Sequence, residues 1–212
     1  MKKLIIIFIS VVLAASFLCS CKKSKDDDLS RVYKMIADMD TYSVNAEIIV
    51  KGNRTTENYN VKQHFKYPDR YRIEVLSPAE RKGKVTAYDG QYLWIYEPWI
   101  KQMHVIEKYK ETEESGMFPG YFAGNLFTSE QADYEYKKFA NIDCIAIKVK
   151  VPGGNAYRKW QILYISRKDM IPLKMEILDS KGNIAVTVYY KNFVYNDKID
   201  DNIFSRDSVG KA

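Results

Sequence analysis

The stretch from residue 89 to residue 98 reads DGQYLWIYEP, and it decides the fold class. Asp89-Gly90 is a strong hairpin signal, because glycine accepts the positive φ that tight turns between strands require. The flanking residues, 84–87 and 91–96, are strand-like in composition. Together they predict an antiparallel β-hairpin, which a further strand over 102–106 extends after the Pro98-Trp99 corner.

Working outward from this hairpin, alternation of apolar and polar residues with a period of two recurs through most of the chain. Glycine, proline, asparagine and aspartate separate the alternating segments, as in turns. We therefore expect a mainly β domain of the α+β class, a curved antiparallel sheet forming an open half-barrel around short helices. Besides the central hairpin, the expected strands are 42–50, 59–66, 71–75, 142–151, 159–166, 173–178 and 184–190.

Two segments break this alternation. An amphipathic helix is expected near the N-terminus, where apolar side chains fall at helical spacing after three aspartates: Leu29, Val32, Tyr33, Ile36 and Met39. Residues 117–127, MFPGYFAGNLF, cannot form a regular strand because they contain two glycines and a proline. We expect a mobile loop with short helices there, with a helix cap at 128–131, and its apolar side chains filling the concave face of the sheet.

The N-terminus has the features of a bacterial lipoprotein signal. Two lysines precede an apolar run over 4–18, which is shorter than a comfortable membrane span. The run ends in Leu18-Cys19-Ser20-Cys21, which resembles a lipobox. That resemblance implies that residues 1–20 are removed and that Cys21 carries a diacylglycerol and an N-acyl chain. An ordinary secretory signal with two incidental cysteines is the alternative.

These features divide the chain into a cleaved signal peptide (1–20), lipidated Cys21 with a flexible tether (21–28), one domain (29–206) and a disordered C-terminus (207–212). Cys144 is then left without a partner for a disulfide, so stability must come from the core. The formal charge of +6 falls slightly when Lys2 and Lys3 leave with the signal. We expect the protein at the extracytoplasmic face of a membrane, where nucleic acid is not a partner.

Signatures of catalysis are missing from the linear sequence. The two histidines, His64 and His104, lie in strand-like segments and neither has a metal-ligand partner at diagnostic spacing. Phosphate-binding glycine loops and dinucleotide fingerprints do not occur either. We therefore expect a protein that is not an enzyme, with no metal site and no cofactor beyond the covalent lipid.

Three stretches resemble the LolA/LolB-type lipoprotein-carrier superfamily: 89–103, 164–176 and 179–204. The resemblance spans about 42–204 and implies a curved sheet with an apolar concavity, which in periplasmic members holds acyl chains. Large apolar side chains offer contact area to such chains, whereas packing in the core is the alternative for each of them. The candidates are Trp94, Tyr96, Trp99, Met103, Phe118, Tyr121, Phe122 and Trp160.

Within that superfamily, the lipobox, the charged tether and the domain rich in Lys, Tyr and Ile resemble the clostridial germination lipoproteins of the GerS type. This resemblance implies a role in spore germination at a spore membrane. The protein would bind and license a cortex N-acetylmuramoyl-L-alanine amidase of the CwlD type, so that muramic-δ-lactam forms. A lipid or lipoprotein carrier, holding acyl chains in the concavity, is the alternative, and an envelope-stress sensor is a third hypothesis.

Overall fold

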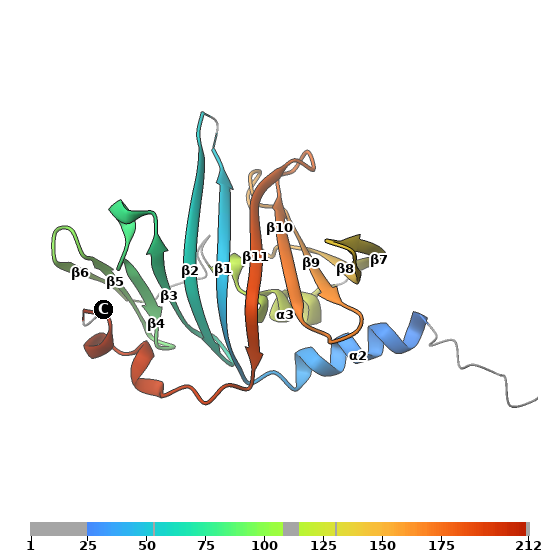
Figure 1. The fold of residues 1–212 in the computed structure, drawn as a ribbon, viewed down its shortest axis with the longest axis horizontal. Helices are drawn as coiled ribbons and strands as arrows, with labels where there is room; N and C mark the ends of the chain where they lie inside the picture. Colours follow the sequence, from blue (N-terminus) through green and yellow to red (C-terminus); the bar gives the residue numbers. More distant parts are fainter. Residues whose placement is uncertain (1–24, 53, 108–114, 130, 211–212) are drawn as a thin grey trace, which may run out of the picture.

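The structure, a computed structural model, describes residues 25–52, 54–107, 115–129 and 131–210 (Figure 1). The expected signal peptide, the lipidation site at Cys21, residues 22–24 of the expected tether and most of the charged segment before residue 115 lie outside the described residues.

The described part of the chain forms one 11-stranded antiparallel sheet, which confirms the predicted curved and open architecture. The strands lie in the order β6-β5-β4-β3-β2-β1-β11-β10-β9-β8-β7. Their bounds are β1 Thr41–Lys51, β2 Thr56–Lys66, β3 Arg70–Ser77, β4 Val85–Tyr88, β5 Tyr92–Glu97, β6 Gln102–Glu107, β7 Ala132–Phe139, β8 Ile142–Lys150, β9 Trp160–Ser166, β10 Pro172–Leu178 and β11 Ile184–Tyr195.

This strand order explains why a helix lies inside the half-barrel. The first six strands form a meander from β1 to the edge strand β6, and the last five form a second meander from the opposite edge, β7, back to β11 beside β1. The chain must therefore pass from one edge of the sheet to the other. It does so through η3 (Ser115–Met117) and α3 (Pro119–Thr128), which lie inside the curve (Figure 1).

The core lies between the concave face and these helices. Alternate residues of each strand point inward, as Tyr42, Val44, Ala46 and Ile48 of β1 do. From the other side, the fully buried rings of Phe118 and Phe122 join the same cluster. Burial of a large apolar side chain contributes about 2 kcal/mol before entropic costs, so the helical segment acts as the second layer of the core, as the sequence predicts.

The N-terminal helix α2 (Lys25–Ala37) is longer than predicted. It begins inside the expected flexible tether, so the assignment of residues 25–28 to a tether is wrong. The reason is an ion pair that the local pattern does not contain. Asp28 is only 1% exposed. Its Oδ2 accepts a hydrogen bond from Arg167 Nε at 2.6 Å, and Arg167 Nη2 lies 2.5 Å from the same oxygen. This pair holds the first turns of α2 against the β9–β10 turn.

Residues 207–210 also differ from the prediction of disorder over 207–212, of which residues 211 and 212 lie outside the described residues. Two short 3₁₀-helices, η4 (Asp201–Phe204) and η5 (Arg206–Ser208), continue the chain across the convex face of the sheet. Val209 is fully buried against Val85 and Ala87 of β4. The Arg72 guanidinium fixes the segment by donating to the carbonyl of Ile203 at 3.2 Å and to Ser208 Oγ at 3.3 Å.

One local prediction in the second half is also wrong. Residues 128–129 lie at the end of helix α3 rather than at the start of a helix, and they are followed by strand β7, for which the sequence makes no prediction. Thr128 Oγ1 donates back to the carbonyl of Gly124 at 2.9 Å, so its hydroxyl bonds to the last turn of the helix instead of capping a new one.

Candidate functional site

An apolar chamber of about 250 Å³ opens within the half-barrel at the ends of β1 to β4. Its body consists of inward-facing aliphatic side chains together with Met117 of η3, and its polar lining residues are Glu57, Tyr59, Arg81, Lys84, Thr86 and Arg158. The aliphatic residues are Ile48, Val50, Val61, Ile73 and Val75. Because this volume lies below the range of about 300–1,000 Å³ that is usual for ligand sites, the chamber fits at most a single chain segment and not a whole multi-chain lipid.

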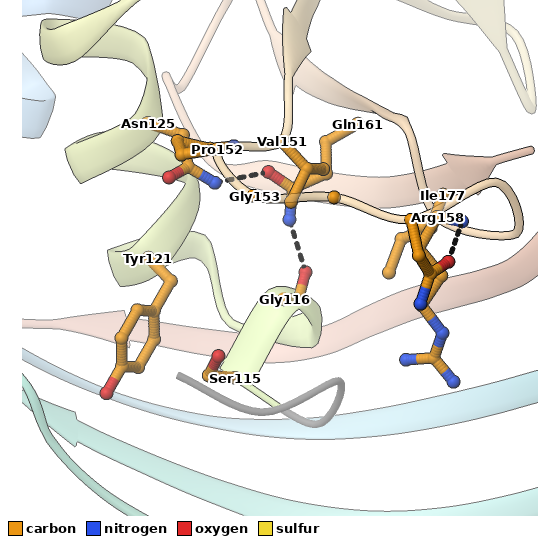
Figure 2. Close-up of a pocket in the computed structure, with 12 residues that line it drawn as sticks. Ser115, Gly116, Tyr121, Asn125, Val151, Pro152, Gly153, Arg158, Gln161 and Ile177 are labelled. Atoms are coloured by element: carbon orange, nitrogen blue, oxygen red, sulfur yellow. Dashed lines mark hydrogen bonds between the residues drawn. The ribbon is translucent and has the colours of Figure 1, made fainter. Parts of the chain in front are cut away.

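A smaller polar slot of about 160 Å³ lies on the other side of η3, between α3 and the loop 151–158. Figure 2 shows its central hydrogen bonds. Asn125 Nδ2 donates to Gln161 Oε1 at 2.8 Å, and Gln161 Nε2 donates to the carbonyl of Gly116 at 2.7 Å. Both amides are buried, so this relay satisfies polar groups that would otherwise be costly, and it locks η3 and α3 to β9.

Arg158 borders both cavities, because its loop passes between the slot and the chamber. The loop is held by Asn155, whose Oδ1 accepts from the backbone amides of Tyr157 and Arg158 at 2.8 and 3.1 Å. Gly154 permits the tight path, since a Cβ there would lie 2.5 Å from the carbonyl oxygen of Arg158. No motif in the sequence predicts the polar slot or a role for the residues that form it, Arg158, Asn125 and Gln161.

Three of the eight candidate residues for the concavity lie on the concave side. Phe118 and Phe122 are fully buried and Tyr121 is half-buried, all against the main core. Tyr121 donates its hydroxyl to the carbonyl of Asp69 at 3.0 Å, and its ring packs edge-on against Phe65. These rings therefore fill the concavity, and the chamber lies beside them rather than being lined by them.

The other five candidates lie elsewhere, which corrects their predicted position. In β5, Leu93 and Ile95 face the core, so strand alternation directs Trp94 and Tyr96 to the convex face, where they pack with Met103 near Val209. Trp160 also faces outward, with Lys148 Nζ 4.6 Å from the centroid of its ring. Trp99 is 71% exposed in the turn between β5 and β6.

Two polar side chains of β2 have unusual surroundings. His64 lies on the convex side, where burial and the nearby charges of Lys62 and Arg72 lower its pKa to about 4. The imidazole is therefore neutral at physiological pH. Gln63 faces the core, and among the described residues neither atom of its side-chain amide has a hydrogen-bond partner. Neither group joins a cluster typical of a catalytic site.

The described residues contain no group of three histidine, cysteine or acidic side chains placed to hold a metal. No helix in the described ranges is long and apolar enough to cross a membrane. Burial raises the pKa of the Cys144 thiol, which disfavours the reactive thiolate form of that residue.

The two edges of the sheet differ in character. The edge strand β7 carries exposed charges typical of protected edges, at Asp133, Glu135, Lys137 and Lys138. The opposite edge strand, β6, has half-exposed Val105 and Ile106, and no strand of the described ranges pairs with its outer side. An unprotected apolar edge is a template for pairing with an extended segment of another protein.

Comparison with known proteins gives a family and a fold. A family model described as "Sporulation protein YdcC-like" matches residues 1–204. The sporulation protein YdcC of Bacillus subtilis (strain 168) is 17% identical over 218 residues, covering 96% of this chain, and the chain spans only 60% of that relative's length.

Among solved structures, one chain in the structure of the CwlD amidase from Clostridioides difficile in complex with the GerS lipoprotein is 30% identical to this chain, with a TM-score of 0.51. The match covers 84% of this chain and 100% of that one. A putative outer membrane lipoprotein-sorting protein domain from Vibrio parahaemolyticus is 11% identical, with a TM-score of 0.50 and coverage of 87% and 97%. This second match supports the predicted LolA-like fold.

Proposed function

This chain belongs to the family of YdcC-like sporulation proteins, and we propose that it is a non-enzymatic lipoprotein that binds a cell-wall amidase during sporulation. In this proposal the chain licenses a cortex N-acetylmuramoyl-L-alanine amidase of the CwlD type, so that muramic-δ-lactam forms and germination can follow. The lipid on Cys21 would hold the domain at the extracytoplasmic face of a spore membrane.

One observation carries the proposal. The match to the CwlD–GerS structure covers that chain completely, at an identity well above that of the LolA-like match. Sequence identity at this level indicates more than a shared fold. A shared fold alone says little about function.

The β6 edge is the surface that we assign to the partner. Its backbone can pair with an extended segment, and exposed Val105 and Ile106 add apolar contact on the two faces of the strand. The β7 edge instead carries four exposed charged side chains, which oppose pairing with another strand.

Co-expression of the mature chain carrying Cys21→Ala with the amidase of the same organism tests this proposal. We expect a stoichiometric complex that Val105→Lys weakens, because a charge at an edge strand opposes pairing. Tyr134→Lys on β7 is the matched control, with similar exposure on the other edge, and should leave the complex intact. Failure of the unmodified chain to bind the amidase would refute the proposal.

The apolar chamber favours a second candidate, a carrier or acceptor that holds part of an acyl chain. Val75→Phe should fill the mouth of the chamber without placing a new group in the centre of the core, since Val75 is only partly buried. A carrier would lose a lipid that co-purifies with the unmodified chain and would lose function. An amidase partner would retain both its complex and its activity.

A further inference from the structure

Two neighbouring loops place exposed apolar side chains at one end of the sheet. The β5–β6 turn carries Trp99 and Ile100, which are 71% and 58% exposed, and Leu76 at the end of β3 is 41% exposed. The loops are adjacent, because a Cβ on Gly83 would lie 3.7 Å from the ring of Pro98. We call Leu76, Trp99 and Ile100, together with the basic residues of the same loops, the tip patch.

Positive charge surrounds these apolar side chains. Arg81, Lys82 and Lys101 are all exposed in the two loops. The acidic side chains nearby are Glu57 and Glu80, which are exposed and line a cavity with Arg81, and Glu97, which Lys84 neutralises at 2.6 Å. The tip patch therefore combines an indole, two aliphatic side chains and a net positive charge.

We propose that the tip patch docks on an anionic phospholipid bilayer. Tryptophan favours the boundary between headgroups and acyl chains, where its ring is buried and its N–H stays hydrated. Basic side chains beside it are attracted to anionic headgroups. The turn can enter this boundary without exposing unpaired strand backbone, because the Lys101 amide donates to the carbonyl of Pro98 and closes it.

Docking of this kind sets the orientation of the domain. Arg81 and Lys84 belong both to the loop that carries the patch and to the lining of the apolar chamber. A bilayer bound at the tip patch therefore faces the opening of the chamber. The contact is independent of the amidase role and of lipid on Cys21.

Sedimentation with vesicles tests the proposal, using the mature chain with Cys21→Ala and phosphatidylcholine vesicles with or without phosphatidylglycerol. We expect binding that requires phosphatidylglycerol and falls as salt is added. The double variant Trp99→Ala/Ile100→Ser should weaken it about ten-fold, and Lys82→Gln or Lys101→Gln about five-fold each. Tyr67→Ala is the control, a 67% exposed aromatic residue at the other end of β2 and β3, and should bind normally.

A second measurement detects contact between the tip patch and the bilayer even where free vesicles bind the chain weakly. The chain is held on vesicles through an N-terminal histidine tag and a nickel-chelating lipid, and brominated lipids then quench tryptophan fluorescence. Quenching that disappears in Trp99→Phe supports the proposal, because Trp94 and Trp160 are half-buried on the convex face. Unquenched Trp99 on anionic vesicles would overturn it. So would loss of the amidase complex in Trp99→Ala without any loss of vesicle binding, since the patch would then serve a protein.

Discussion

Replacing Gly120 by alanine tests how tightly α3 is packed inside the half-barrel. Gly120 lies in the first turn of the helix, directly over the ring of Phe65 from β2. A Cβ at this position would come within 3.0 Å of three ring carbons, and the most distant of the three would be only 2.6 Å away. The ring or the helix must therefore move.

The surroundings of Phe65 restrict that movement. The ring is 1% exposed, it stacks on Tyr42 with centroids 5.4 Å apart, and Tyr121 packs edge-on at 5.9 Å. Overpacking of a close-packed core costs about 1–3 kcal/mol, and we expect the upper part of this range. Alanine recovers up to about 1 kcal/mol through its better helix propensity. The net loss in the free energy of unfolding should be about 2 kcal/mol.

Gly124→Ala is the matched control in the same helix. Gly124 is exposed, and a Cβ there would meet nothing within 4 Å, so we expect stabilisation by about 0.5–1 kcal/mol. Urea unfolding of both variants measures the difference, with an unchanged m-value as the check that both remain two-state. Equal effects of the two alanines would refute the position of α3 against β2.

Further predictions concern single buried groups and the anchor. Asp28→Asn should lower the free energy of unfolding by about 2 kcal/mol, because it leaves the partly exposed Arg167 without its ion pair; urea unfolding measures this. Gln63→Leu should raise the thermal midpoint, with a gain of about 1–2 kcal/mol, because the buried amide makes no hydrogen bond to any described residue. The pKa of His64, lowered to about 4, predicts that stability falls as the pH drops from about 6.5 towards 4, because only the unfolded chain takes up the proton. After discounting for partial solvation, the loss is about 1–2 kcal/mol, and His64→Gln should remove it in unfolding curves recorded at pH 7 and pH 5. Cys21→Ala should release the protein from membranes into the soluble fraction of fractionated cells, because the lipid requires a thiol.

For each of these variants, one outcome would contradict the prediction. An Asp28→Asn variant as stable as the parent would mean that α2 is not held by the ion pair. Destabilisation by Gln63→Leu would show that its amide has a partner in solution. A flat pH dependence, or one that persists in His64→Gln, would place the titrating group elsewhere. Membrane-bound Cys21→Ala protein would contradict lipidation as the main attachment.

The sequence predicts the sheet well because the alternation in each strand is set by burial on one face. The Asp89-Gly90 turn is one example: Asp89 Oδ1 accepts from the amides of Gln91 and Tyr92 at 2.8 and 2.7 Å, so the local sequence alone closes it. Strand β7 was missed because its charged side chains hide the alternation of Tyr134 and Tyr136, which is typical of an edge strand.

The site was harder to predict because alternation does not say which face of a strand is concave. Trp94 and Tyr96 have the composition expected of a ligand cavity, yet they face the C-terminal segment. That segment docks through Val209, an isolated apolar residue in a polar stretch, and through Arg72 from a distant strand. Such contacts depend on tertiary structure, as does the Asp28–Arg167 pair, and no local pattern encodes them.

We propose that this domain acts on the cell wall only through an amidase partner. The most direct test measures amidase activity on cortex peptidoglycan with the amidase alone, with the mature chain alone, and with both. We predict activity, and muramic-δ-lactam in the product, only when both proteins are present. Full activity of the amidase alone, or activity of this chain by itself, would show that the chain does not act through the amidase.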